Sequence, residues 1–296
     1  MANLSKSSRL KTNCEYGACA RTDIAMPEEA ANDAYVDANE VLESDHEALD
    51  LSVIIPVYNE QERIAATLYN VKDYLESTDL KFEIVVVDDG SNDMTAEIVK
   101  FVDIYGSEFK SQQTGQLEEN VKNVGKGYSI AKGMMRAKGD IVLFSDADGA
   151  TPITELTKLI EQINSGFDVV VGSRQHPESQ VTGRTWLRRV LSKGFNYIAT
   201  TMGLLSVRDS QCGFKAYRRE AARKVAALQQ TNGFCFDVEQ LYIAKKLGLE
   251  IGEIPVSWHH HEGSSLSLFS DSIAMFCDLI KIRFIHRHLT VTGDSH

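Results

Sequence analysis

The sequence has few cysteines, and they are scattered. The five are Cys14, Cys19, Cys212, Cys235 and Cys277, and no two of them form a Cys-x-x-Cys pair. An odd number of widely separated cysteines argues against a disulfide framework and against a structural zinc site. We therefore expect the protein to work in a reducing compartment.

Long apolar runs are also missing. No stretch approaches the roughly 20 apolar residues that a membrane-spanning helix needs, and the first residues lack the apolar core of a signal peptide. We expect a cytoplasmic protein without the spans of a processive polysaccharide synthase. No serine lies in a Gly-x-Ser-x-Gly turn, so a serine hydrolase has no support.

Positive charge is absent from much of the N-terminal region. Residues 22–50 contain ten Asp and Glu and no Lys or Arg. Residues 1–50 hold eleven acidic and four basic side chains, and so carry −7 of the formal net charge of −11. Because this region has no sustained apolar period, we predict that residues 1–50 are a disordered acidic tail. We expect no nucleic-acid partner.

From residue 51 onward, apolar strands alternate with amphipathic helices. The pattern predicts strands at 51–57, 82–87, 140–144 and 167–171, and helices at 64–75, 95–105 and 153–163. This order is typical of an α/β fold with a mostly parallel central sheet and flanking helices. We assign one catalytic domain to residues 51–268. The polar residues 106–120 predict either a short edge strand or an inserted loop.

Polar and acidic side chains follow the predicted strands. They occur in Pro56-Val57-Tyr58-Asn59-Glu60, Asp88-Asp89-Gly90-Ser91, Ser145-Asp146-Ala147-Asp148 and Gly172-Ser173-Arg174. In an open parallel sheet, ligands bind beyond the carboxyl ends of the strands. Asp146 and Asp148 are two residues apart, and paired carboxylates suit Mg²⁺ or Mn²⁺ that also holds a diphosphate.

Several of these residues allow two interpretations. Asp88 and Asp89 either cap the next helix or accept the imino hydrogen of a uracil or guanine ring. The glycines around Lys126 predict either an ordinary helix start or an anion site. Arg174 is either a solvated charge or a phosphate clamp, and Asp237 either caps a helix that runs to residue 247 or faces a sugar. We expect the blocks 209–215 and 234–239 to lie beside helix starts.

Two segments combine an apolar stripe with basic side chains. The first contains Leu187, Val190, Leu191, Phe195, Ile198 and Met202 near Arg184, Arg188, Arg189 and Lys193; the second contains Ile273, Phe276, Ile280 and Phe284, with Lys281, Arg283 and Arg287 nearby. Such helices either pack on a core or lie on an anionic membrane. We assign residues 269–296 to an amphipathic, membrane-surface segment. Peripheral contact with the cytosolic face of a membrane is expected.

The strand-end motifs, together with Asn123-x-Gly125-Lys126-Gly127, resemble those of family 2 glycosyltransferases with the GT-A fold. The blocks Asp209-Ser210-Gln211-Cys212-Gly213-Phe214-Lys215, Phe236-Asp237-Val238-Glu239 and Trp258 followed by Glu262-Gly263-Ser264 look like the dolichyl-phosphate β-glucosyltransferase branch. The resemblance runs from about residue 51 to residue 288. It implies a Rossmann-like nucleotide-binding half.

The resemblance also implies roles for individual residues. Those that would bind the nucleotide sugar are Pro56, Tyr58, Glu60, Asp88, Asp89, Lys126, Asp146 and Ala147. Asp146 and Asp148 would hold the metal, and Asp148, Asp237 and Arg174 would act in catalysis. Gln211, Glu239 and Trp258 would face the sugar or the acceptor.

The implied reaction is the inverting transfer of glucose from UDP-glucose to a polyprenyl phosphate, either dolichyl or undecaprenyl. An anionic acceptor needs no strong base, whereas a hydroxyl acceptor requires a carboxylate such as Asp237 to take its proton. This branch usually has a membrane-spanning N-terminal helix and a lysine at the position of Ser265. These departures leave open a related bacterial-type enzyme with another lipid or a soluble acceptor. The sequence alone also leaves open another donor such as GDP-mannose, a polysaccharide acceptor, or a non-catalytic sugar-nucleotide binder.

Overall fold

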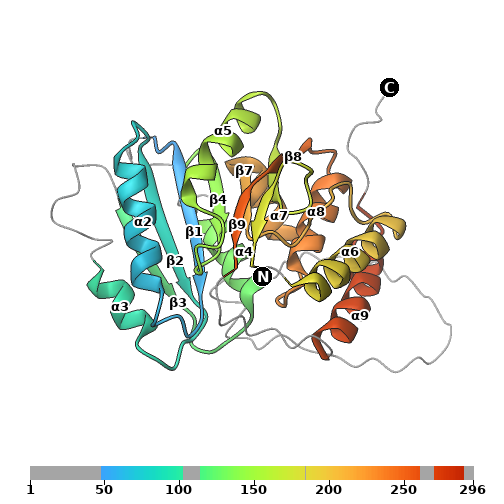
Figure 1. Ribbon diagram of the computed structural model, residues 1–296, viewed down its shortest axis with the longest axis horizontal. Helices are drawn as coiled ribbons and strands as arrows, with labels where there is room; N and C mark the ends of the chain where they lie inside the picture. Colours follow the sequence, from blue (N-terminus) through green and yellow to red (C-terminus); the bar gives the residue numbers. More distant parts are fainter. Residues whose placement is uncertain (1–47, 103–113, 184, 261–269, 290–296) are drawn as a thin grey trace, which may run out of the picture. The chain divides into compact units, whose positions relative to one another are not determined.

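A mostly parallel sheet of seven strands forms the centre of the protein (Figure 1). The computed structural model describes residues 48–102, 114–183, 185–260 and 270–289, so the predicted tail up to residue 47 and the block 262–265 lie outside the described residues. The strands are β1 (Leu51–Val57), β2 (Phe82–Asp88), β3 (Thr114–Glu119), β4 (Ile141–Ser145), β5 (Val169–Ser173), β7 (Phe214–Arg218) and β8 (Ile251–Pro255). Their order is β3-β2-β1-β4-β7-β5-β8.

Within the sheet, β7 runs antiparallel to its neighbours β4 and β5, and the other pairings are parallel. The carboxyl ends of β1, β2, β3 and β4 therefore meet at one edge. A separate parallel ribbon pairs β6 (Gln180–Thr182) with β9 (Ser257–His259). The predicted α/β fold with a mostly parallel sheet is confirmed.

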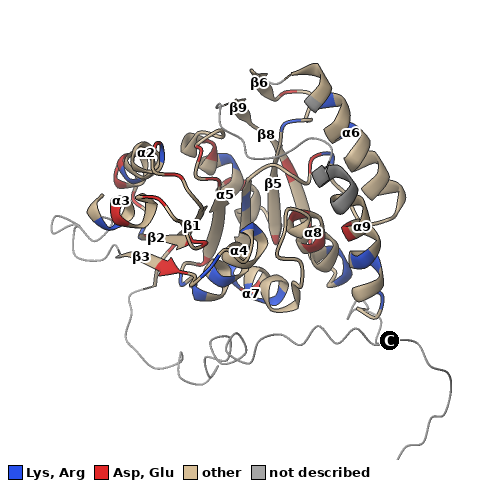
Figure 2. Ribbon diagram, turned by 90° about the horizontal axis from the view of Figure 1, so that it is seen from below, with Lys and Arg blue, Asp and Glu red and all other residues tan. Residues whose placement is uncertain are grey.

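Helices cover both faces of the sheet (Figure 2). The helices are α2 (Ile64–Glu76), α3 (Thr95–Phe101), α4 (Lys126–Arg136), α5 (Leu156–Asn164) after the short η1 (Ile153–Glu155), α6 (Trp186–Thr201), α7 (Arg219–Leu228), α8 (Phe236–Lys246) and α9 (Ser270–Ile285). Successive strand residues face opposite sides. Ile54 accordingly packs toward α4, α7 and α8, while Val53 and Ile55 pack toward α2, α3 and α5.

The structure refines several predicted elements. β3 is a short strand at the sheet edge, which decides between the two interpretations of residues 106–120 for the part from Thr114 onward. The predicted strand at 167–171 begins later, at Val169, because Phe167 N still donates to Gln162 O at the end of α5. The block 209–215 leads into strand β7 rather than a helix, so that prediction is wrong. Lys215 and Tyr217 on one side of β7 are as buried as Phe214 and Ala216 on the other, which hides the alternation of a strand from the sequence.

Candidate active site

Asp146, Ala147 and Asp148 form a turn directly after β4. Asp146 N donates to Gly213 O at 3.0 Å, which ties the turn to the residue before β7. The carbonyl oxygen of Ala147 accepts a hydrogen bond from Thr67 Oγ1 at 2.7 Å, and Asp148 Oδ1 accepts one from Ala150 N at 3.0 Å. The backbone of the turn is thus fixed by Gly213 and Thr67, and the Asp148 carboxylate is held by a local hydrogen bond.

Lys126 is the partner of Asp146. Its Nζ lies 2.5 Å from Asp146 Oδ1, and the two side chains are 31% and 30% exposed. Burial alone would lower the pKa of Lys126, but the charges of Asp146, Asp237 and Asp148 and the hydrogen bond to Asp146 together raise that pKa, so the ammonium keeps its proton. A permanent positive charge beside the acidic turn can attract an anionic ligand.

The two acidic side chains of the turn suit a hard divalent cation. Among the described residues, no group of three or more His, Cys, Asp or Glu side chains is arranged to hold a metal. A cation held by the carboxylates of Asp146 and Asp148 would have its remaining positions filled by water and phosphate oxygens. That division of ligands is usual for Mg²⁺ bound with a nucleotide.

Asp88 is the last residue of β2 and Asp89 follows it directly, and the two carboxylates have different partners. Asp89 Oδ1 accepts hydrogen bonds from Val124 N and Asn120 Nδ2, and its Oδ2 accepts one from Gly125 N at 2.8 Å. Asp89 therefore holds the loop that starts α4, where Gly125 has a φ of +122° that favours glycine.

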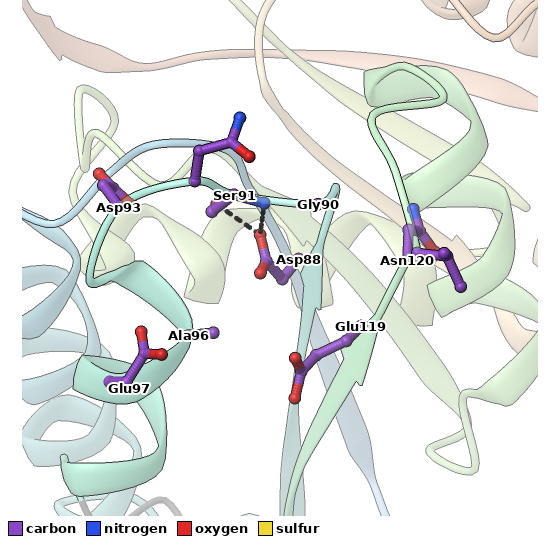
Figure 3. Close-up of a pocket in the computed structure, with 10 residues that line it drawn as sticks. Asp88, Gly90, Ser91, Asp93, Ala96, Glu97, Glu119 and Asn120 are labelled. Carbon is purple, nitrogen blue, oxygen red and sulfur yellow. Dashed lines mark hydrogen bonds between the residues drawn. The ribbon is translucent and has the colours of Figure 1, made fainter.

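Asp88 lines a pocket of about 440 Å³ (Figure 3). The hydrogen bonds from Ser91 N and Ser91 Oγ both reach Asp88 Oδ1, at 3.1 and 2.5 Å, so Oδ2 is the oxygen available to a ligand. Burial raises the pKa of Asp88 above its usual value. Glu97 of α3 and Glu119 of β3 line the pocket from opposite sides, so the pocket favours ligand groups that donate hydrogen bonds (Figure 3).

The residues after β1 connect to the same turn. Asn59 has a left-handed φ of +54°, its N donates to Ser91 Oγ, and its Oδ1 accepts from Asn92 N. The conformation leaves Tyr58 42% exposed at the strand end, while Pro56 is buried within β1. Glu60, predicted to bind the nucleotide, forms an ion pair with Arg63.

Arg174 follows β5 and is held by a buried carboxylate that the sequence did not single out. Its Nε and Nη2 donate to Asp209 Oδ2 and Oδ1 at 2.7 and 2.9 Å. Burial would lower the pKa of Arg174, but Asp209 raises it, so the charge is permanent. The guanidinium lies 5.7 Å from the ring centre of Trp258. A pocket of about 240 Å³ joins Arg174 to Arg189 and Lys193 on α6.

Asp237 lies in the first turn of α8, whose N-cap is Cys235, and pairs with the fully buried Lys215. Lys215 Nζ also donates to Cys212 O at 2.8 Å and lies 5.3 Å from the ring centre of Phe144. Burial raises the pKa of Asp237, although Lys215 opposes that rise. The sequence does not reveal the role of Lys215, because a lysine inside a strand gives no sign of burial.

The remaining predicted residues occupy different environments. Gln211 is half-buried, and its N–H donates to Asp209 Oδ1. Glu239 is fully buried, and both of its oxygens accept hydrogen bonds from protein groups. Trp258 stacks on His260 with the ring centres 5.9 Å apart, and the neighbouring His259 N donates to Ala150 O beside the acidic turn.

Known structures share this fold. Glucosyl-3-phosphoglycerate synthase from Mycobacterium tuberculosis, solved with Mn²⁺, UDP-glucose and phosphoglyceric acid, superposes with a TM-score of 0.61 at 19% identity, covering 79% of each chain. A complex of the same enzyme with Mn²⁺, UDP and glucosyl-3-phosphoglycerate gives a TM-score of 0.60. At this identity the likeness establishes the fold, a GT-A type sheet with flanking helices.

Sequence relatives are closer. A dolichyl-phosphate β-glucosyltransferase of Trichomonas vaginalis is 38% identical over 248 residues, 80% of this chain and 74% of the relative. The enzymes of that name from Saccharomyces cerevisiae and Homo sapiens are 37% and 36% identical, covering 82% and 81% of this chain and 76% of each relative. The resemblance to this branch, drawn from the motifs, is confirmed. Residues 52–226 match the family model described as "Glycosyl transferase family 2", and the chain belongs to that family.

Proposed function

We propose that the protein transfers glucose from UDP-glucose to a polyprenyl phosphate with inversion at the anomeric carbon. The observation that carries this proposal is the order in which three sites lie along one edge of the sheet. An acidic pocket lies at β2 and β3, a pair of carboxylates follows β4, and a basic pocket lies between β5 and α6. A base, a metal-bound diphosphate and a phosphate acceptor require these chemistries in this order.

The donor would lie across β2, β1 and β4. Neighbouring strands are about 4.8 Å apart, so the ends of β2 and β4 are separated by about 10 Å, a span that a nucleoside diphosphate can cover. Asp88 Oδ2 would accept the imino hydrogen of uracil, and Tyr58 would cover the ribose. Relatives that carry the name glucosyltransferase support glucose as the sugar.

Asp146 and Asp148 would hold Mg²⁺ or Mn²⁺ against the donor diphosphate. A bound divalent cation stabilises the negative charge that develops on UDP as the bond from the anomeric carbon to its oxygen breaks. Lys126, now paired with Asp146, would contact the diphosphate oxygens and keep the donor oriented. An acceptor oxygen then attacks the anomeric carbon from the face opposite UDP.

The basic pocket supports an anionic acceptor. Arg174, Arg189 and Lys193 line it together with the polar side chains of Gln175 and Ser179. A phosphate monoester fits such a set of donors, and it reaches the anomeric carbon already ionised. A hydroxyl acceptor would need Asp237 as its base, yet Asp237 is bound to Lys215. The phosphate acceptor is therefore the better supported of the two candidates.

Helix α6 supports a lipid acceptor because four of the six residues of its predicted apolar stripe are exposed, while Phe195 and Met202 pack against the core. The polar side chains Ser192 and Asn196 are buried, whereas Trp186, Val190 and Tyr197 are 74%, 55% and 71% exposed. An apolar outer face edged by cations suits the interface of an anionic membrane. This arrangement disfavours the simpler interpretation of α6 as a helix with its apolar stripe in the core.

Helix α9 also exposes apolar side chains. Leu279 and Ile282 are buried in one cluster with Ala199 of α6, while Phe276, Ile280 and Phe284 are 45%, 40% and 62% exposed. None of the helices in the described part of the chain is long and apolar enough to cross a membrane. We propose that α6 and α9 together rest on a membrane surface, on the cytosolic face, beside the basic pocket.

The donor assignment predicts selective stabilisation. With Mn²⁺ present, UDP-glucose at a hundredfold excess over its dissociation constant should stabilise the fold by about 2.7 kcal/mol, and GDP-mannose should give no shift. Thermal unfolding with each nucleotide sugar checks this. UDP release should then require a polyprenyl phosphate. Stabilisation by GDP-mannose alone would overturn the choice of UDP-glucose.

The membrane assignment predicts a loss of vesicle binding on substitution of exposed apolar residues. The double variant Val190→Asp, Phe284→Asp should bind anionic vesicles at least about tenfold more weakly, because each side chain forfeits 1.5–3 kcal/mol of apolar burial. Flotation with vesicles of anionic lipid measures this. Phe101→Asp is the matched control, since Phe101 is 86% exposed on α3 at the other end of the sheet. Equal flotation of both variants would contradict the assignment.

A further inference from the structure

A buried pair of ionisable side chains lies away from the strand ends. Glu239, in the first turn of α8, is fully buried, and His286, directly after α9, is 3% exposed. Glu239 Oε1 and His286 Nε2 are 2.6 Å apart. Burying a carboxylate costs free energy unless both oxygens are hydrogen-bonded, so the other partners of Glu239 indicate what it does.

Those partners are backbone N–H groups of one turn. Gln230 N donates to Glu239 Oε1 at 3.0 Å, and Thr231 N donates to Oε2 at 2.7 Å. Gln229 braces the same turn, since its Nε2 donates to Gly127 O and to Thr231 O at 2.8 and 2.9 Å. The carboxylate of Glu239 therefore fixes residues 229–232 and links them to the end of α9.

The turn at 229–232 packs directly on the start of α4. Gly127 N donates to Asn232 O at 2.8 Å. A Cβ on Gly125 would lie 2.4 Å from Asn232 O, and one on Gly127 would lie 2.5 Å from Thr231 O, so the turn touches the helix start with no room between them. Lys126 lies between these glycines, and its Nζ reaches Asp146. The turn therefore positions the backbone from which the Lys126 side chain extends to Asp146.

We propose that Glu239 and His286 are positioning residues for the donor. Through these two residues, the position of the C-terminal helix α9 is coupled to the position of Lys126 at the start of α4. The inference rests on the proposed use of Lys126 and Asp146 to bind a metal-bound nucleoside diphosphate. It gives Glu239 a role on the donor side instead of the acceptor side that the sequence resemblance implied. The helix whose outer face is proposed to meet the membrane then also supports donor binding.

Calorimetric titration of the full chain with UDP and Mn²⁺ tests this inference. Glu239→Gln and His286→Leu should each weaken UDP binding about tenfold, the lower end of the effect of removing an outer-shell partner of a metal site. His286→Gln, whose amide can still donate to Glu239, should recover most of the affinity. Glu83→Gln is the matched control, because Glu83 is also fully buried and accepts Lys138 N at 2.7 Å, but at the opposite end of the strands.

The outcomes separate this inference from the proposed function. Wild-type affinity in Glu239→Gln, or an equal loss in Glu83→Gln, would overturn the positioning role. His286→Gln as weak as His286→Leu would mean that the histidine only fills space, which also overturns it. Wild-type protein that fails to bind UDP would refute the donor assignment and this inference together.

Discussion

Replacing Asp148 with Asn should lower the metal-dependent transfer rate by about 10²- to 10³-fold while leaving the fold intact, because the variant loses a charge aimed at the leaving diphosphate. Asp148 is half-buried in a turn, and Ala150 N can still donate to the retained amide oxygen. Release of UDP from UDP-glucose with Mn²⁺ and polyprenyl phosphate measures the effect. Thermal unfolding should show little change, since Asp148 supports no core contact.

A control variant at the other end of β4 shows whether the loss of activity comes from the position of the carboxylate or only from the loss of one negative charge. Asp140 immediately precedes β4, is 66% exposed at its side chain, and pairs with Arg219. Asp140→Asn removes the same charge far from the proposed diphosphate site, and its activity should stay near that of the wild type. Unchanged turnover in Asp148→Asn would refute the assignment of this carboxylate to the metal.

The strand ends were predictable because local pattern and chain topology agree there. Unbroken apolar runs identified β1, β2 and β4, and the rule that ligands bind beyond the carboxyl ends of parallel strands selected Asp88, Asp146 and their neighbours. The structure gathers these residues at one edge, as expected. The family resemblance added residue roles that the pattern alone left open.

The second half of the sheet was less predictable, since its geometry depends on distant partners. β7 has buried residues on both sides and reads as neither an alternating strand nor an apolar run, so Lys215 gave no signal. Asp209 could not be linked to Arg174 because 35 residues separate them in sequence. On α6, the inward direction of Ser192 and Asn196 follows from contacts such as Ser210 to Asn196, which periodicity does not encode.

Helix geometry also explains why the sequence could not predict the partners of Glu239. Its position beside Asp237 suggests that both carboxylates face a ligand, yet residues two apart on a helix point in different directions. Asp237 turns toward Lys215 and the acidic turn, whereas Glu239 turns toward His286. Only the hydrogen-bond partners of Asp237 and Glu239 show which residue lies at the site and which one supports it.

Gly213 limits the space around Asp146, one of the two carboxylates proposed to hold the metal. A Cβ at this position would lie 1.8 Å from Asp146 Oδ2 and 2.1 Å from its Cγ, so Gly213→Ala must push the Asp146 carboxylate out of place. We expect Mn²⁺-dependent activity to fall about 10²-fold, as for the loss of a metal-orienting contact. Overpacking should cost about 1–3 kcal/mol of stability, which the fold can absorb.

A double-mutant cycle shows whether the glycine acts through Asp146. If it does, adding Gly213→Ala to Asp146→Ala should cause little further loss of Mn²⁺-dependent turnover, because the displaced carboxylate is already gone. Gly194→Ala is the control, since a Cβ there meets nothing within 4 Å, and alanine should stabilise the exposed helix by up to about 1 kcal/mol. Additive losses in the double variant would instead mean that Gly213 matters for β7 itself. The cycle therefore tests whether the close approach of β7 to the acidic turn exists to shape the metal site.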